Sequence, residues 1–437
     1  MASPPAAETA AETASETEIA ELVQEHRVHR RLYVDPGIFA LEMRRVFGAT
    51  WTYLAHESQL RQPGDFVSTH LGLRPVLVTR GTDGTVHGLL NRCRHRGVVL
   101  PADRCGSAKR FTCPYHGWSY ANDGRLVAVP YPDTYGPDFD RDALGLGRLR
   151  VESYRGFVFG TLAADTTGLG DHLGTARPWL DAYVDRRPGG IEVVGHPVVQ
   201  AFRGNWKLSW DNATDGLHAT FAHRSYNELG LGASTETVLA RDPASTPMYG
   251  KAMGNGHMVV DQRPGLPDGA WAAQREVPGS AEHARVLAER EGDEAAGRLL
   301  QHATGDMVNL CLFPNLLFVG NQLMVVRPIA VDETHLELWL TQATGTPVEV
   351  HAIRPRVEED FTNFGTPDDV EMFERAQRGL AQVPEVEWVD VSRGLGAGDW
   401  VDDDGLPTGS ITSEAPMRGY LRRYRDLMLR EQEVRSW

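Results

Sequence analysis

A paired cysteine–histidine pattern between residues 93 and 116 limits what this chain can fold into more than any other feature. The stretch holds Cys93-x-His95, then 17 residues, and then Cys113-x-x-His116. Two thiolates suit one iron of a [2Fe–2S] cluster and two imidazoles suit the other, and imidazole in place of thiolate raises the reduction potential of the cluster. Zinc fingers instead order their ligands Cys, Cys, His, His. The pattern therefore favours a [2Fe–2S] cluster, held by two short loops, over a structural zinc site.

Composition excludes several classes of protein. The 437 residues predict two or three domains, and 41% hydrophobic residues are enough for sizeable cores. A formal net charge of -15 argues against a nucleic-acid-binding protein, which needs a basic face. The four cysteines are too few for a secreted disulfide scaffold, and both candidate ligand thiols must stay reduced, so we expect a cytoplasmic protein. Because no stretch reaches 18 apolar residues, we expect no transmembrane helix.

The first half of the chain predicts an arm, two helices and a β domain. Residues 1–20 lack a secretory signal, and their Ala, Thr and Glu content predicts disorder. Residues 17–32 are consistent with a short helix, Pro36-Gly37 marks a turn, and a second helix is expected over 38–48. From residue 51 to 160, short apolar runs separated by glycine-containing turns predict a small all-β domain. Its expected strands include residues 76–78, 85–90, 111–113 and 157–162.

From residue 161 onward, strand and helix patterns mix. Residues 190–210 predict two strands or one long bent strand, and residues 310–330 and 334–344 predict buried antiparallel strands. Helices are expected over 283–303, 367–383 and 416–432. The second part of the chain is therefore expected to be a mixed α+β domain.

A second group of candidate ligands lies in residues 205–226. Asp215 and His218 are three residues apart and so share one face of a helix. His218 and His223 are five apart, about 140° around an ideal helix, so both cannot face one metal ion from a regular helix. Either the helix is interrupted between them or it carries a bulge. Two histidines and a distant carboxylate form the facial triad that leaves open positions on ferrous iron, although two unrelated histidines would show the same spacing.

The best candidate for that carboxylate lies in residues 364–380. Thr366 has the character of an N-cap, Pro367 suits the first helical position, and Asp368 and Asp369 fall in the first turn. Acids at this position also stabilise the helix dipole without binding a metal, and local features alone favour that explanation. Glu358, Glu359 and Asp360 are competing carboxylates upstream.

From about residue 38 to its C-terminus, the chain resembles the large subunits of Rieske non-haem iron aromatic-ring-hydroxylating dioxygenases. The resemblance rests on Cys93-x-His95…Cys113-x-x-His116-Gly-Trp118 and on Asp211-Asn212-x-x-Asp215-x-x-His218-x4-His223. The chain has Asp211 where the family usually has Glu, and Leu217 where Tyr is frequent. Residues 387–395 and 413–428 resemble the benzoate-type branch of the family.

The resemblance implies a fold and two metal sites. The fold would be α+β, with a small all-β Rieske [2Fe–2S] domain at 51–160 inserted into a helix-grip catalytic domain at 161–437 that has a long antiparallel sheet and is joined by residues 21–50. Cys93, His95, Cys113 and His116 would hold the cluster. His218, His223 and Asp369, the second acid of an Asp-Asp pair, would hold Fe(II). The Asp215 carboxylate would hydrogen-bond His218 and meet a cluster histidine of a neighbouring subunit, which makes it the expected electron-transfer bridge.

The implied function is that of a terminal oxygenase. It would take electrons from a separate reductase, with or without a ferredoxin, because the chain lacks the G-x-G-x-x-G nucleotide fingerprint. It would add both atoms of O2 to an aromatic ring, giving a cis-dihydrodiol. Family members form trimers, α3β3 with a small β subunit or homotrimers, and the substrate pocket is expected near the iron motif and residues 307–325. The alternatives are a Rieske monooxygenase or demethylase, and a non-enzymatic electron carrier of the ferredoxin type, which would leave residues 161–437 unexplained.

Overall fold

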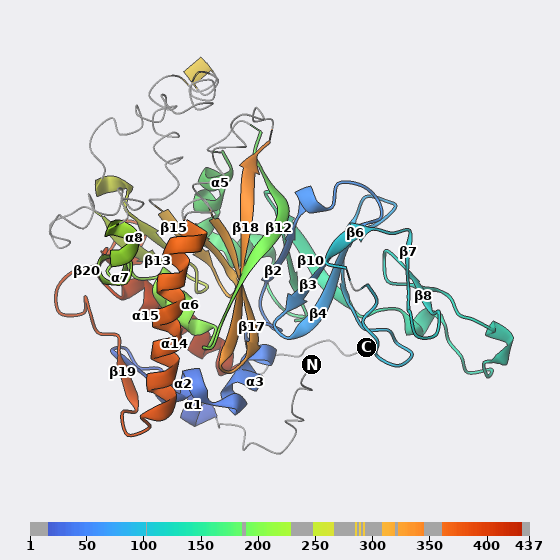
Figure 1. Cartoon of the computed structure of the whole chain (residues 1–437), viewed down its shortest axis with the longest axis horizontal. Helices are drawn as coiled ribbons and strands as arrows, with labels where there is room; N and C mark the ends of the chain where they lie inside the picture. The colour runs from blue at the N-terminus through green and yellow to red at the C-terminus, as the bar shows by residue number, and fades with distance from the viewer. Residues whose placement is uncertain are drawn as a thin grey trace.

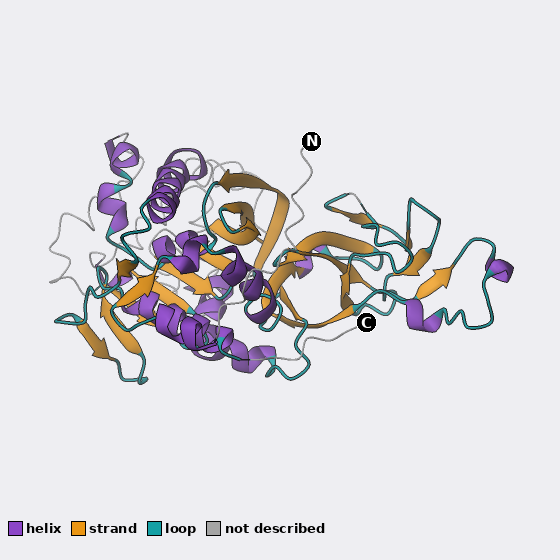
Figure 2. Ribbon diagram, turned by 90° about the horizontal axis from the view of Figure 1, so that it is seen from below, coloured by secondary structure: helices purple, strands orange, loops and turns teal. Residues whose placement is uncertain are grey.

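The computed structural model describes residues 16–101, 103–185, 189–228, 248–265, 285, 288–289, 292, 308–319, 322–344 and 361–430. Within these residues, two β bodies lie side by side, and helices cover one of them (Figures 1 and 2). None of the described helices has the length and apolar character needed to cross a membrane.

The smaller body is built on a seven-stranded antiparallel sheet in the order β2-β11-β10-β5-β4-β3-β6. Its strands are β2 (Thr52–His56), β3 (Asp65–Leu71), β4 (Arg74–Arg80), β5 (Val86–Leu90), β6 (Cys105–Ser107), β10 (Arg148–Tyr154) and β11 (Phe157–Thr161). A three-stranded sheet of β7 (Arg110–Thr112), β8 (Ser119–Ala121) and β9 (Leu126–Ala128) extends away from the larger body (Figure 1). The strands expected around 76–78, 85–90, 111–113 and 157–162 are all present as β4, β5, β7 and β11.

The larger body contains a nine-stranded antiparallel sheet in the order β12-β18-β17-β16-β15-β14-β13-β21-β20. Its strands are β12 (Ile191–Phe202), β13 (Tyr249–Ala252), β14 (Met258–Asp261), β15 (Val308–Leu312), β16 (Leu316–Val319), β17 (Gln322–Ala330), β18 (Glu333–Ala343), β20 (Asp399–Val401) and β21 (Pro407–Ser410). β12 is bent, because its pairing with β18 shifts register between Val194 and Val198. The strand expectation for 190–210 is right only to Phe202, since helix α6 (Lys207–Ala213) follows.

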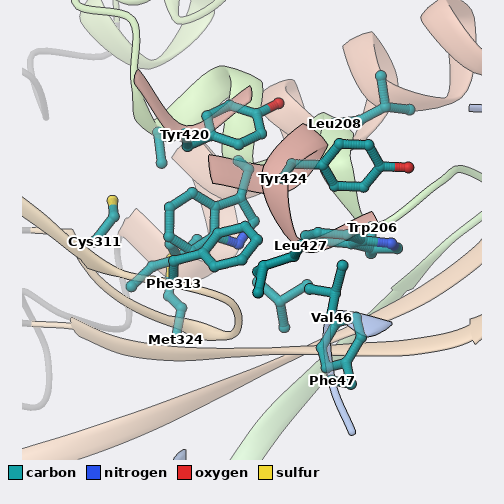
Figure 3. Close-up of a cluster of buried hydrophobic side chains, with 14 of the residues drawn as sticks. Val46, Phe47, Trp206, Leu208, Cys311, Phe313, Met324, Tyr420, Tyr424 and Leu427 are labelled. Atoms are coloured by element: carbon teal, nitrogen blue, oxygen red, sulfur yellow. The ribbon is translucent and has the colours of Figure 1, made fainter. Parts of the chain in front are cut away.

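Helices cover the larger sheet and close its core. α14 (Thr366–Gln382) packs against α6, and α15 (Ala415–Met428) contacts β13, β14 and β21. α15 contributes Tyr420 and Tyr424 to an aromatic core, in which these two side chains, Trp206 and Phe313 are at most 1% exposed (Figure 3). Burying each such ring contributes roughly 1.5–3 kcal/mol, so this layer fixes α6 against α15. α4 (Leu169–Leu173) and α5 (Arg177–Asp185) link the two bodies along the chain.

The N-terminal segment differs from its prediction. Residues 17–32 form not one helix but α1 (Glu16–Leu22), β1 (Arg27–His29) and α2 (Arg31–Val34), with β1 paired to β19 (Trp388–Asp390). Pairing with a distant strand overrides the local helical pattern. Residues 16–20 of the expected disordered arm are therefore helical, and residues 1–15 lie outside the described part. Pro36-Gly37 is not a turn but the start of α3 (Pro36–Arg45), because the Asp35 carboxylate accepts hydrogen bonds from the Gly37 and Ile38 N–H groups.

Two predictions fall where the structure describes little. The helix expected over 283–303 lies in a stretch of which only residues 285, 288, 289 and 292 are described. The competing acids Glu358, Glu359 and Asp360 lie outside the described residues.

Candidate metal centres

Two loops of matching geometry carry the first set of candidate ligands. One follows β5 and holds Cys93 and His95, and the other joins β7 to β8 and holds Cys113 and His116. In each loop a glycine N–H donates back to the cysteine carbonyl, from Gly97 at 2.9 Å and from Gly117 at 3.0 Å. Both glycines have φ above +70°, a conformation that side chains other than glycine rarely adopt. The glycine is therefore part of what closes each loop around its cysteine and histidine.

The two loops bring their cysteines into one buried cluster and their histidine rings into contact. Both cysteines are buried, while the two histidine rings are partly exposed with centroids 4.6 Å apart. The Nδ1 atoms of His95 and His116 are buried and have no hydrogen-bond partner among the described residues, which is uncommon unless another ligand is meant to bind there. Two sulfur and two nitrogen donors in this arrangement fit a [2Fe–2S] cluster of the Rieske type.

Neighbouring aromatic side chains support the loops. Trp118 stacks on His95 with centroids 5.0 Å apart and planes 9° apart, and its indole N–H donates to the Tyr135 hydroxyl. The Tyr120 hydroxyl lies 3.3 Å from the Cys93 Sγ atom and accepts from the Arg94 N–H. These contacts fix the histidine ring and place a hydroxyl beside a candidate cluster sulfur.

The helix carrying the second set of ligands is interrupted, as one of the two expected alternatives requires. α7 (His218–Phe221) ends before His223, and α8 (Arg224–Glu228) begins after it. The break lets both histidines face the same point, with ring centroids 5.3 Å apart. His218 is partly exposed and His223 is buried.

Asp369 completes this second group from the first turn of α14. Its Oδ1 atom lies 3.2 Å from His223 Nε2 and 3.7 Å from His218 Nε2, and one donor atom from each residue lies within 4.8 Å of the others. Donors that each sit about 2 Å from one ion have separations of this size. Burial raises the pKa of the Asp369 carboxyl, and the two histidines and the Asn212 amide oppose that shift. A buried carboxylate facing two imidazoles fits the 2-His-1-carboxylate set that suits non-haem Fe(II).

The start of α14 differs from the expected cap. Gly365 is the N-cap and Thr366 is already helical. A π-helical turn (Phe361–Gly365) leads directly into the helix. Asp368 accepts a 3.0 Å hydrogen bond from the Ser225 hydroxyl, while Asp369 points to the histidines. Asp368 also lies 3.6 Å from the Nδ1 atom of His223, so the two adjacent acids face the two ring nitrogens of the same histidine.

A cavity opens beside these three side chains. Its apolar wall is formed by Ala213, Leu317, Val319, Met324, Leu336 and Phe373. Ser209, Asn212, Asn309 and Thr366 add polar groups. Four lining residues, Asn309, Leu317, Val319 and Met324, fall in the expected stretch 307–325. Leu336 and Phe373 lie outside it, because their strand and helix reach the cavity only through the tertiary fold. A cavity with a mostly apolar wall and a few polar groups suits an aromatic substrate.

Asp215 departs from its expected contact. The His218 Nδ1 atom lies 2.7 Å from the backbone carbonyl of Asp215, not from its carboxylate. The carboxylate instead accepts from the Leu217 N–H at 2.6 Å and faces the Arg393 guanidinium at 3.6 Å. Residue spacing alone could not show whether the carbonyl or the carboxylate of Asp215 contacts His218. The carboxylate is engaged by the Leu217 N–H in a local turn, which leaves the carbonyl for the histidine.

The fold and the two donor sets define an iron–sulfur oxygenase class in which a Rieske-type cluster domain accompanies a mononuclear iron domain. Residues 50–154 match the family described as the Rieske [2Fe-2S] domain, and residues 183–430 match the ring hydroxylating alpha subunit (catalytic domain). The chain belongs to the large subunits of the aromatic-ring-hydroxylating dioxygenases, in the benzoate-type branch.

Individual relatives agree with this family. The chain is 35% identical to the toluate 1,2-dioxygenase subunit alpha of Pseudomonas putida over 82% of this chain and 79% of that one. It is 34% identical to the anthranilate 1,2-dioxygenase large subunit of Acinetobacter baylyi, over 84% and 80%. A solved naphthalene 1,2-dioxygenase with indole bound in the active site superposes with a TM-score of 0.79 at 27% identity, covering 94% of each chain. The dioxygenase prediction and the expected [2Fe–2S] and iron cofactors are confirmed at the level of the family.

Proposed function

We propose that Cys93, His95, Cys113 and His116 hold the [2Fe–2S] cluster and that His218, His223 and Asp369 hold Fe(II). The observation that carries the proposal is the convergence of the last three side chains from two separate elements beside an apolar cavity. When bound, the cluster supplies single electrons and the iron binds and activates O2. The chain's own residues position the ring, exclude water with the apolar wall, and hold His218 through the Asp215 carbonyl.

We propose an aromatic carboxylate as the substrate class. The relatives named above act, by their names, on toluate and anthranilate. The cavity offers an apolar wall for the ring, and Asn309 and Ser209 as neutral hydrogen-bonding groups for a polar substituent. The product would be a cis-dihydrodiol on the ring.

We propose that the oxygenase works as a trimer, with or without a small β subunit, in the reducing cytoplasm where the cluster thiols stay free. A separate reductase, with or without a ferredoxin, would supply the electrons. The cluster domain carries β7 and β8 at one end of the molecule and α7 and α8 lie at the other (Figure 1). This separation favours electron transfer between different subunits, from the cluster domain of one to Asp215 of the next. We also propose the division of the chain expected from the sequence, with the cluster domain at 51–160 and residues 21–50 joining 161–437.

The experiment is turnover of benzoate, toluate and anthranilate by the purified oxygenase with a surrogate reductase, NADH and labelled O2. Two labelled oxygen atoms in one ring-hydroxylated product are expected. One labelled atom, or loss of a methyl group without ring hydroxylation, would support the monooxygenase or demethylase alternative instead. Turnover of unsubstituted arenes but no carboxylates would contradict only the substrate class.

A further inference from the structure

A charge cluster surrounds the turn that carries Asp215. The Asp215 Oδ1 atom lies 3.6 Å from the Arg393 guanidinium, and the same guanidinium donates a 3.3 Å hydrogen bond to Glu414. Arg393 therefore stands between two carboxylates that would otherwise repel one another. Its side chain is 39% exposed, against 24% for Asp215 and 17% for Glu414. The cluster thus reaches the surface with its cation outermost.

The backbone of Arg393 is fixed independently of its side chain. Its N–H donates to Glu414 Oε2 at 2.8 Å, and its carbonyl accepts from the Glu414 N–H at 2.9 Å and from the Arg418 guanidinium at 3.0 Å. Arg418 is 3% exposed, so this anchor belongs to the core. Because the backbone of Arg393 is fixed, only side-chain rotamer freedom is lost when its guanidinium contacts Asp215.

The turn that carries Asp215 is also held by a backbone contact to the segment before α15. The Gly216 N–H donates to the Ile411 carbonyl at 3.3 Å, and a Cβ atom added at Gly216 would meet the Ile411 side chain and carbonyl. Within the turn, the backbone carbonyl of Asp215 holds His218, and the carboxylate turns outward to Arg393. One residue thus offers its carbonyl to the iron side and its carboxylate to the surface.

We infer that Arg393, backed by Glu414, is the positioning residue of Asp215 in electron transfer between subunits. The inference rests on the role proposed above for Asp215. Arg393 holds the carboxylate directed outward, so that a cluster histidine of a neighbouring subunit meets an acceptor that is already oriented. With both groups bound, the one electron given up by the cluster would be the one received by the mononuclear iron site, and Asp215 would hold the contact between subunits without itself being oxidised or reduced. The preorganised carboxylate lowers the cost of forming the contact.

The test compares Arg393→Gln, Arg393→Lys and Asp215→Asn with the parent holoenzyme. Arg422→Gln is the matched control. Arg422 has a similar exposure of 36% and also pairs with a glutamate, Glu25. It lies on α15, the helix that begins directly after Glu414. Four quantities are measured: iron content, the cluster absorption spectrum, the oligomeric mass by sedimentation, and the rate at which a reduced cluster is reoxidised by O2 with substrate bound. The first three report structure and assembly, and the last reports electron transfer.

Arg393→Gln is expected to slow reoxidation by about 10-fold or more with the other three quantities unchanged, and Arg393→Lys to recover part of the rate. Adding Arg393→Gln to Asp215→Asn should slow transfer no further. Parent-like reoxidation in Arg393→Gln alongside slow reoxidation in Asp215→Asn would overturn this inference alone. Parent-like rates in Asp215→Asn would overturn the bridge and with it the role of Arg393. Loss of iron or of the trimer in Arg393→Gln would show a purely structural role and would also overturn the inference.

Discussion

At the scale of single residues, two adjacent acids face the two ring nitrogens of His223 in the proposed iron site. Asp369 is 6% exposed and faces both histidines, while its neighbour Asp368 binds the Ser225 hydroxyl. Acidic residues in a first helical turn are common, so position alone could not separate them. What separates them is the atom that each side chain faces: Asp369 faces the Nε2 atoms of both histidines, whereas Asp368 faces the Nδ1 atom of His223.

Asp369→Ala should remove the mononuclear iron and leave the cluster intact. Without the carboxylate, two imidazoles remain, and a site that loses one ligand of a facial triad binds the ion weakly. Iron analysis and the cluster absorption spectrum check this, with Glu371→Ala as the control that retains the iron, because Glu371 lies half-exposed on the same helix and pairs with Arg375. Retention of the mononuclear iron in Asp369→Ala would show that another carboxylate serves as the ligand.

At the scale of secondary-structure elements, α3, α6 and α15 are joined by a buried charge pair. The Lys207 Nζ atom lies 2.5 Å from Glu42 Oε1, and both side chains are 0% exposed. Glu42 also accepts from the Trp206 indole at 2.7 Å and from the Tyr424 hydroxyl at 2.6 Å. Burial lowers the pKa of Lys207, and the Glu42 carboxylate opposes that shift. The pair therefore fixes the helix that leads into the proposed iron ligands.

Lys207→Met should destabilise the fold by about 3–5 kcal/mol, because it leaves the Glu42 charge buried without a cation. The thermal unfolding midpoint of the apoprotein would measure the loss. The double variant Lys207→Met with Glu42→Gln should recover part of the stability, since the uncompensated charge is gone. Equal midpoints for the parent and Lys207→Met would contradict the importance of the pair.

Elements also show which features could be predicted from the sequence. Local patterns predict the metal-ligand spacings, the strands β4, β5, β7 and β11, and the helices α14 and α15. They can do so because short motifs and amphipathic periods depend only on residues close together in the chain. The β1–β19 pairing and the Arg393–Asp215 contact could not be predicted, because each joins residues far apart in the chain. The break between α7 and α8 could be stated only as one of two alternatives.

At the scale of the whole molecule, buried neutral histidines should make stability depend on pH. Burial lowers the pKa of His56, His70 and His257 to about 4. Their unfolded pKa is about 6.5, so the unfolded chain binds protons first as the pH falls. The stability from these groups is complete above about pH 6.5 and is lost as the pH falls towards 4.

The thermal midpoint should therefore fall between pH 6.5 and 4, with fully buried His257 alone contributing ~3 kcal/mol of the change. The variant His257→Asn should flatten part of this dependence, whatever its stability at pH 8. Midpoints measured in buffers of constant ionic strength check this. A midpoint that stays constant from pH 7 to 4.5 would contradict it.

The central claim is that the two metal centres of one chain serve different subunits. The direct measurement is oxygenase activity of mixed oligomers, formed by co-expressing Cys93→Ser, which lacks the cluster, with Asp369→Ala, which lacks the mononuclear iron. Each variant alone should be inactive, and the mixed oligomers should regain activity, because the cluster of one subunit can supply the iron of its neighbour. Mixed oligomers that form with the parent mass and stay inactive would contradict electron transfer between subunits.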